Sequence, residues 1–262
     1  MLKLNNLPYQ TDAGIAERAA IGIIVLATDQ SVEYEFRLLL DLPGVAFFES
    51  RIRNDTSITP ATLKDMENRI EESTRVILPD VPLDVVAFGC TSASMVIGEE
   101  GVFERIRRAR PEVACTTPVT AAFAAFRAFN AKRIGVLTPY RDDVNQVVAD
   151  YFVSNGFSVP VFGSFNEEND NLVARIDRQS LVAAVDQVRD AAEVDALFVS
   201  CTNVRLAEFA KDVEDACGLP VTSSNHAMAW HCLRLAGVTD IQPEYGSLFT
   251  LQAEPKTAEE VD

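Results

Sequence analysis

Short apolar runs alternate with amphipathic segments of helical length along almost the whole chain. We predict strands at about 21–27, 45–50, 84–89, 113–116, 133–138, 158–163, 195–200 and 219–222. Helices are predicted between them, at about 31–42, 60–78, 94–109, 118–129, 142–155, 178–192, 204–217 and 225–236. Parallel strands need long crossover connections, so this alternation is typical of an α/β fold with parallel sheets.

The order of these elements repeats once. A strand ending in Cys90 and a strand ending in Cys201 are each followed by a helix, a short strand and a second helix. We therefore predict two flavodoxin-like lobes with parallel sheets, related by a pseudo-twofold axis, with the active site in the cleft between them. Lobe 1 would comprise residues 1–117 plus 224–262 and lobe 2 residues 118–223. The polar, charged tail 254–262 is expected to be disordered.

The composition limits the partners of the chain. A net charge of −16 over 262 residues excludes nucleic-acid binding, which needs a basic surface. No apolar run approaches the length needed to cross a bilayer. Five cysteines without a CxxC pair, and only two histidines, argue against a disulfide framework and against a metal site. We expect a cytoplasmic protein without a cofactor, and the oligomeric state, including a homo-oligomer, stays open.

Two apolar runs end in a cysteine followed by small polar residues, namely Gly89-Cys90-Thr91-Ser92 and Ser200-Cys201-Thr202-Asn203. Open α/β sheets bind ligands at the carboxyl ends of their strands. If a helix begins there, its N-terminus would lower the thiol pKa and offer N–H donors to an anion. We therefore predict that Cys90 and Cys201 are catalytic, either as a proton-transfer pair or as nucleophiles that add to a double bond. Neither use needs a metal or an organic cofactor.

Other polar residues follow predicted strands. Asp29 would either cap the next helix or contact a substrate ammonium group or Cys90. Tyr140 would serve as packing or as a phenolic donor to an oxyanion, and Asn171 as a turn residue or a binding residue. The other three cysteines are interpreted as packing residues: Cys115, Cys217 and Cys232.

The two cysteine motifs resemble those of the aspartate/glutamate racemase superfamily. The segments 21–35, 138–140 and 223–230 are most similar to its maleate cis–trans isomerase and arylmalonate decarboxylase branch, which also includes racemase-like proteins of ectoine utilisation. The resemblance implies cofactor-independent chemistry next to a carboxylate, with Cys90 and Cys201 as the thiols. It further implies residues that surround the substrate: Thr91, Ser92, Tyr140, Asn171, Thr202 and Asn203.

Two departures from the family pattern bear on the substrate. Maleate isomerases carry an asparagine where Asp29 falls, and a carboxylate there would favour an ammonium group over a second substrate carboxylate. Glutamate-type racemases have a histidine where Asn203 stands. We therefore expect an isomerase or racemase of a small carboxylic or amino acid. The alternatives are an arylmalonate-type decarboxylase and a non-catalytic protein that binds a small ligand.

Overall fold

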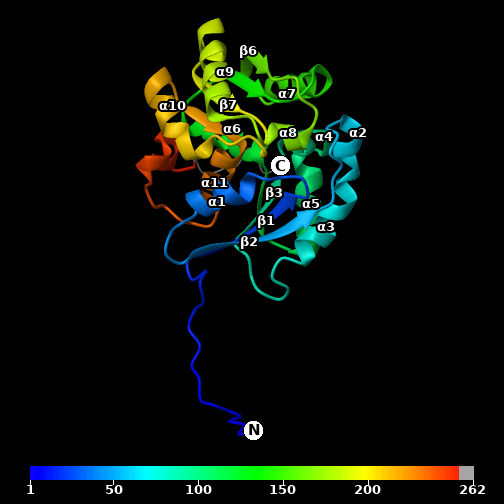
Figure 1. The fold of residues 1–262 in the computed structure, drawn as a ribbon, viewed down its shortest axis with the longest axis vertical. Helices are drawn as coiled ribbons and strands as arrows, with labels where there is room; N and C mark the ends of the chain where they lie inside the picture. Colours follow the sequence, from blue (N-terminus) through cyan, green and yellow to red (C-terminus); the bar gives the residue numbers. More distant parts are fainter. Residues whose placement is uncertain (254–262) are drawn as a thin grey trace.

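The computed structural model describes residues 1–253 and contains two four-stranded parallel sheets (Figure 1). The first has the order β2-β1-β3-β4, made of Val45–Ile52, Ala19–Leu26, Val85–Gly89 and Ala114–Thr116. The second has the order β6-β5-β7-β8, made of Ser158–Ser164, Arg133–Thr138, Ala196–Val199 and Val221–Ser223. Both sheets repeat one topology and every strand pair is parallel. The predicted α/β fold with two flavodoxin-like sheets is confirmed.

Helices connect the strands in both halves. The first half contains α1 (Val32–Leu39), α2 (Pro60–Asp65), α3 (Glu67–Arg75), α4 (Thr91–Ile97) and α5 (Glu99–Ala109). The second contains α7 (Asp142–Ser154), α8 (Asp170–Val173), α9 (Arg178–Ala191), the 3₁₀ turn η1 (Ala207–Phe209) and α10 (Ala210–Cys217). The remaining elements are α6 (Pro118–Ala128), α11 (Ser224–Leu235) and the 3₁₀ turns η2 (Pro243–Tyr245) and η3 (Ser247–Thr250).

Three helical predictions need correction, and one helix was missed. The helix predicted at 60–78 is interrupted at Met66 and ends at Arg75. The helix predicted at 94–109 begins earlier, at Thr91, and breaks at Gly98, whose φ of 92° is incompatible with a right-handed helix. The helix predicted at 204–217 begins only at Ala207, and the short helix α8 was not predicted.

Helices α6 and α11 join the two halves. One face of α6 places Val119, Phe123 and Phe126 in the core of the second sheet. Its other face is built from alanines such as Ala121 and Ala125, which belong to the core of the first sheet together with α11. Small side chains allow two helices to approach closely. The two sheets are therefore joined through a closely packed helix pair.

The division into lobe 1 (1–117 plus 224–262) and lobe 2 (118–223) remains a prediction. It is supported by the sheets, since the first contains strands from residues 19–116 and the second strands from residues 133–223. Helix α11 also packs in the core of the first sheet. The predicted disordered tail 254–262 lies outside the described residues.

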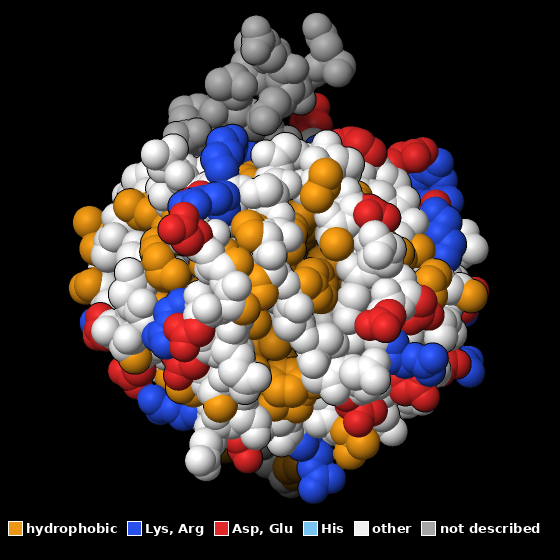
Figure 2. Space-filling view, turned by 90° about the horizontal axis from the view of Figure 1, so that it is seen from above, with side chains coloured by type: hydrophobic (Ala, Val, Ile, Leu, Met, Phe, Trp, Pro, Cys, Tyr) orange, Lys and Arg blue, Asp and Glu red, His pale blue; other side chains and the backbone are white. Residues whose placement is uncertain are grey.

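Figure 2 shows apolar side chains across the middle of one face of the molecule, with charged side chains mainly towards its rim. Exposed ion pairs link charged residues four positions apart, such as Arg75 with Glu71 within α3, and Arg69 of α3 with Asp65 at the end of α2. Exposed pairs of this kind contribute little to stability. None of the helices in residues 1–253 is long and apolar enough to span a membrane.

Candidate active site

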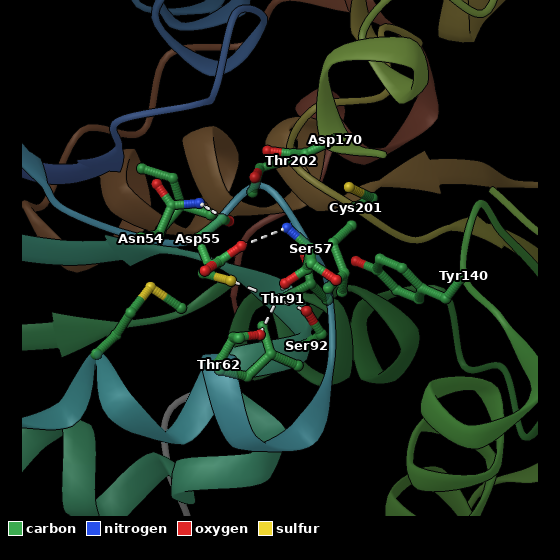
Figure 3. Close-up of a pocket in the computed structure, with 15 residues that line it drawn as sticks. Asn54, Asp55, Ser57, Thr62, Thr91, Ser92, Tyr140, Asp170, Cys201 and Thr202 are labelled. Atoms are coloured by element: carbon green, nitrogen blue, oxygen red, sulfur yellow. Dashed lines mark hydrogen bonds between the residues drawn. The ribbon is translucent and has the colours of Figure 1, made fainter. Parts of the chain in front are cut away.

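Cys90 and Cys201 line one cavity at the carboxyl edges of the two sheets. The space between atoms there, including its opening to solvent, is about 400 Å³. Its wall includes four more of the residues predicted from the sequence: Thr91, Ser92, Tyr140 and Thr202. In Figure 3 the Tyr140 ring points towards Ser92, and Cys201 lies on the same side of the cavity as Tyr140. The prediction that two distant thiols share one site agrees with this geometry.

The Cys90 loop (residues 89–92) leads directly from β3 into α4. Cys90 is the N-cap of α4, with extended backbone angles, and its sulfur lies 3.9 Å from the Ser92 hydroxyl. Burial raises the pKa of the Cys90 thiol to about 12, although the backbone N–H of Ala93 and the Ser92 hydroxyl act in the opposite direction. The pKa of Cys90 is therefore raised and not lowered as predicted, because desolvation outweighs the effect of the helix terminus.

The Cys201 loop (residues 200–206) contains no helix. Cys201 has a φ of 110°, in the left-handed region that side-chain-bearing residues rarely adopt. The prediction that its thiol sits at a helix N-terminus is wrong, since the next helix begins at Ala207. Burial, followed by the negative charge of Asp170, raises the pKa of the Cys201 thiol well above its usual value, and a hydrogen bond with Tyr140 lowers it. Burial thus favours the protonated form of both thiols.

One hydroxyl connects the two cysteine loops. Ser224, the first residue of α11, accepts hydrogen bonds from the backbone N–H of Cys201 at 2.9 Å and from the hydroxyl of Thr91 at 2.8 Å. Ser224 is fully buried. Sequence reasoning had placed this residue within a family-like segment without assigning it a role.

A buried carboxyl group supports the Cys201 loop from the other side. Glu35 on α1 accepts hydrogen bonds from the backbone N–H of Ala207 at 2.7 Å and from the amide of Asn225 at 2.6 Å. The same amide donates to the carbonyl of Thr202 at 2.6 Å. Burial raises the pKa of Glu35 to about 8, since no cation pairs with it among the described residues. The sequence provides no signal for this role, because charged residues on a helix usually face solvent.

Asp29 caps helix α1. One of its carboxylate oxygens accepts hydrogen bonds from the backbone N–H groups of Ser31 and Val32, both at 2.8 Å. The other is buried. A side-chain hydrogen bond with Thr202 acts to lower the pKa of Asp29. Asp29 is not among the residues that line the cavity. Burial raises its pKa to about 7 despite the two backbone donors.

The two predicted asparagines also lie beside the cavity wall. The side chain of Asn203 accepts from the backbone N–H of Gln30 at 2.8 Å and donates to the carbonyl of Asp170 at 2.9 Å. Asn171 is exposed, and its side-chain oxygen accepts from the amide of Gln30 at 3.0 Å. The structure thus places both residues in contacts between loops.

Sequence reasoning missed Asp170 and the segment that follows β2. Asp170 is buried and lines the cavity, and its carboxylate accepts a hydrogen bond from the Thr28 hydroxyl. Asn54, Asp55 and Ser57 line the cavity after β2 (Figure 3). The polar run that starts at Asn54 was the available signal, because the carboxyl end of β2 lies at the same sheet edge as those of β1 and β3.

The histidines are part of the packed interior. The ring of His226 contacts the Thr222 hydroxyl at 3.0 Å and the carbonyl of Tyr245 at 2.7 Å, and the ring of His231 contacts the Thr116 hydroxyl at 2.8 Å. Across residues 1–253, no group of three or more His, Cys, Asp or Glu side chains is arranged to hold a metal ion.

Two parallel sheets of one topology, with a cysteine from each in a shared cavity, define a two-thiol α/β protein. A sequence model described as arylmalonate decarboxylase matches residues 21–249, and the chain belongs to that family. The maleate isomerase of Nocardia farcinica is 27% identical over 87% of this chain and 94% of its own length. The arylmalonate decarboxylase of Bordetella bronchiseptica is 32% identical over 52% of this chain and 57% of its own.

Solved structures agree with these sequence relatives. A maleate isomerase from Pseudomonas putida S16 with maleate has a TM-score of 0.81 and 25% identity, covering 88% of this chain and 97% of its own. A cysteine-to-serine mutant of the Nocardia farcinica maleate cis–trans isomerase carries a covalently bound succinylcysteine intermediate, with a TM-score of 0.81, 26% identity, and coverage of 88% and 98%. The predicted resemblance to this branch of the superfamily is confirmed.

Proposed function

We propose that this protein is a cofactor-independent isomerase that acts next to the carboxylate of a small carboxylic or amino acid through Cys90 and Cys201. The observation that carries the proposal is that both thiols line one cavity. The family supports it, since a relative of the same fold holds its substrate carbon on a cysteine as a succinylcysteine intermediate.

Neutral donors would hold the substrate carboxylate. Ser92 and Tyr140 line the cavity between the thiols, and their hydroxyls can donate to an oxyanion as negative charge moves onto it during the reaction. Thr91 and Thr202 also line the cavity. We assign Asp29, Asn171 and Asn203 to the loops that position these donors, as their contacts with neighbouring loops suggest.

Two balanced routes fit a pair of thiols. In cis–trans isomerisation one thiolate adds to the double bond, a carbon–sulfur bond forms, and the electron pair moves to the carbon next to the carboxylate. Rotation about the new single bond and departure of the thiolate then restore the double bond. In racemisation one thiolate removes the α-proton and the opposite thiol delivers a proton to the other face.

The test uses Cys90→Ala and Cys201→Ala. Conversion of maleate to fumarate, and deuterium uptake at the α-carbon of amino acids in D₂O, are both followed by NMR. Each variant is expected to lose at least about a hundredfold in activity, the range associated with loss of a general acid–base or nucleophilic group. Cys217→Ala is the control, because Cys217 lies on α10 and does not line the cavity. Full activity in either cavity variant contradicts the proposal.

The second candidate is decarboxylation of a malonate-type acid, favoured by the family match itself. That reaction uses one thiol, on the Cys201 side, so Cys90→Gly would keep releasing carbon dioxide. A non-catalytic ligand-binding protein would instead show two inert thiols. Slow iodoacetamide labelling of Cys90 and Cys201, unchanged by added acids, identifies that case.

The proposal extends to the setting of the enzyme. A cytoplasmic location is supported by five cysteines that form no disulfide within residues 1–253. An amino-acid substrate would agree with a step in ectoine utilisation, which expression with and without ectoine would test. Assembly as a homo-oligomer is measured directly by light scattering.

A further inference from the structure

The carboxylate of Asp170 is an inward-facing charge in the cavity wall. Asp170 is only 4% exposed, yet it lines the cavity. One of its oxygens accepts the hydrogen bond from the Thr28 hydroxyl, and the other has no hydrogen-bond partner among the described residues. In Figure 3 Asp170 lies next to Thr202, the residue that follows Cys201. A carboxylate oxygen that stays accessible in the wall of a poorly solvated cavity is suited to a ligand that carries a donor or a positive charge.

No cation balances this charge inside the cavity. Among the lining residues within 1–253 there is no lysine, arginine or histidine, and the second acidic residue, Asp55, lies exposed at the mouth. Just behind the wall, Asp29 is a further buried carboxyl group, with a pKa of about 7. Among the side chains of residues 1–253 that line the cavity, the formal charges of the acidic residues are therefore all negative.

The neighbouring arginines lie outside the cavity. Arg51 pairs with Glu33 at 2.8 Å and donates to the backbone carbonyl of Asp29, so it does not contact either buried carboxylate. Arg53 and Arg69 line an adjoining outer groove. Any positive charge close to the thiols must therefore come from the substrate.

We propose that the cavity selects a short zwitterionic substrate, whose ammonium group binds Asp170 while its carboxylate binds the hydroxyls of Ser92 and Tyr140, and that it disfavours dicarboxylates. This rests on the proposed function, which makes the cavity the active site. A second substrate carboxylate near Asp170 would add like charge in a poorly solvated space, whereas an ammonium group there would form a charge-assisted hydrogen bond.

The same charge distribution couples binding to reactivity. The negative charge of Asp170 raises the pKa of both thiols, in addition to the larger effect of burial. A bound ammonium group would offset that charge, so it would favour the thiolates that either route requires. A dicarboxylate would act in the opposite direction.

Four-carbon acids that differ by one group test the proposal through binding alone. Butyrate, α-aminobutyrate, γ-aminobutyrate and succinate are titrated calorimetrically at one ionic strength. At least one aminobutyrate is expected to bind about tenfold or more tightly than butyrate, and succinate to bind more weakly than butyrate. In Asp170→Asn the preference for the ammonium group should shrink to within about threefold. Glu168→Gln makes the same change of charge at an exposed ion pair with Arg141 and should behave as wild type.

Three results overturn the proposal: succinate binds the wild type more tightly than both aminobutyrates, none of the four acids binds, or Asp170→Asn keeps the full preference. The affinities of the wild type for the four acids test the proposal even if Asp170→Asn does not fold. Because binding is measured without turnover, a failure of the two-thiol chemistry would appear only in the cysteine variants and leaves this comparison intact.

Discussion

The Cys90 loop and the Cys201 loop have the same short pattern, a cysteine followed by a threonine after a buried strand, yet they are stabilised differently. Cys90 continues into a helix and keeps ordinary extended backbone angles. Cys201 has a φ of 110° and is followed by five residues without helical structure. The first loop follows from local sequence, whereas the second depends on contacts with distant elements.

The contacts of the Cys201 loop come from several parts of the chain. The Ser224 hydroxyl accepts from the Cys201 N–H, and the Asn225 amide donates to the Thr202 carbonyl. The Glu35 carboxyl group accepts from the Asn225 amide and from the N–H of Ala207, which follows the loop. Backbone strain persists only where the surroundings determine the conformation. This comparison indicates that the reactivity of Cys201, more than that of Cys90, depends on residues that never touch the substrate.

The largest effect is expected from the pH dependence that Glu35 introduces. Its pKa is about 8 in the folded protein, against an ordinary value of 4.5. The folded state therefore binds more protons between these values, so stability is greatest below about pH 4.5 with respect to this group and falls as the pH rises through about 8. Glu35→Gln mimics the protonated form and should remove a decline on the order of 3 kcal/mol between pH 5 and pH 9.

Urea unfolding of wild type and Glu35→Gln across that pH range measures this effect. Asp29, whose pKa is raised to about 7, leaves a smaller decline of the same sign in the variant. Glu33→Gln is the control, since Glu33 lies on the same helix and pairs with Arg51. Parallel pH profiles for wild type and Glu35→Gln would show that Glu35 does not support the Cys201 loop in the way described.

A second prediction concerns the hydroxyl that joins the loops. Ser224→Ala leaves the Cys201 N–H and the Thr91 hydroxyl without an acceptor, and we expect a loss of about 2 kcal/mol in unfolding free energy. Iodoacetamide labelling, resolved by mass spectrometry, should accelerate more at Cys201 than at Cys90. Ser154→Ala, which removes a hydroxyl that bonds within its own helix, should change neither rate. If labelling accelerated equally at Cys90 and Cys201, the Cys201 loop would not depend more strongly on Ser224 than the Cys90 loop does.

The smallest effect tests the backbone of Cys201 itself. Glycine tolerates positive φ, so Cys201→Gly should be more stable than Cys201→Ala by about 1 kcal/mol. The same pair at Cys232, inside α11, should differ by about 1 kcal/mol in the opposite direction, because glycine is unfavourable within a helix. Thermal unfolding of the four variants gives both differences. An alanine at position 201 that is as stable as glycine would argue against a strained loop.

Most of the fold was predictable because its signals are local. Apolar runs such as 133–138 mark buried strands, and Pro118 and Gly218 mark a helix start and a helix end. The helix predicted from residue 204 was wrong at its start because the side chain of Asn203 forms hydrogen bonds with Gln30 and Asp170, which lie in other loops. The local periodicity of the sequence contains no information about such distant hydrogen bonds.

The site was predictable in part for the same reason. Cys90, Cys201 and Tyr140 follow strands, so their place at a sheet edge could be inferred from order along the chain. Asp170 lies in a polar stretch of sequence, and it is buried where that stretch packs against Thr28, which is 142 positions away. The direction of a loop side chain is set by such packing and not by its neighbours in sequence.

The amino-acid sequence by itself determined the α/β alternation, the repeated topology and the two cysteines at strand ends, because each is carried by short-range patterns of apolar and polar residues. Only the tertiary structure decided which groups share the cavity, why burial raises the pKa of both thiols, and how Glu35 and Ser224 support the Cys201 loop. Burial and long-range hydrogen bonds act between residues that folding alone brings together, so these properties could not be read from the order of residues.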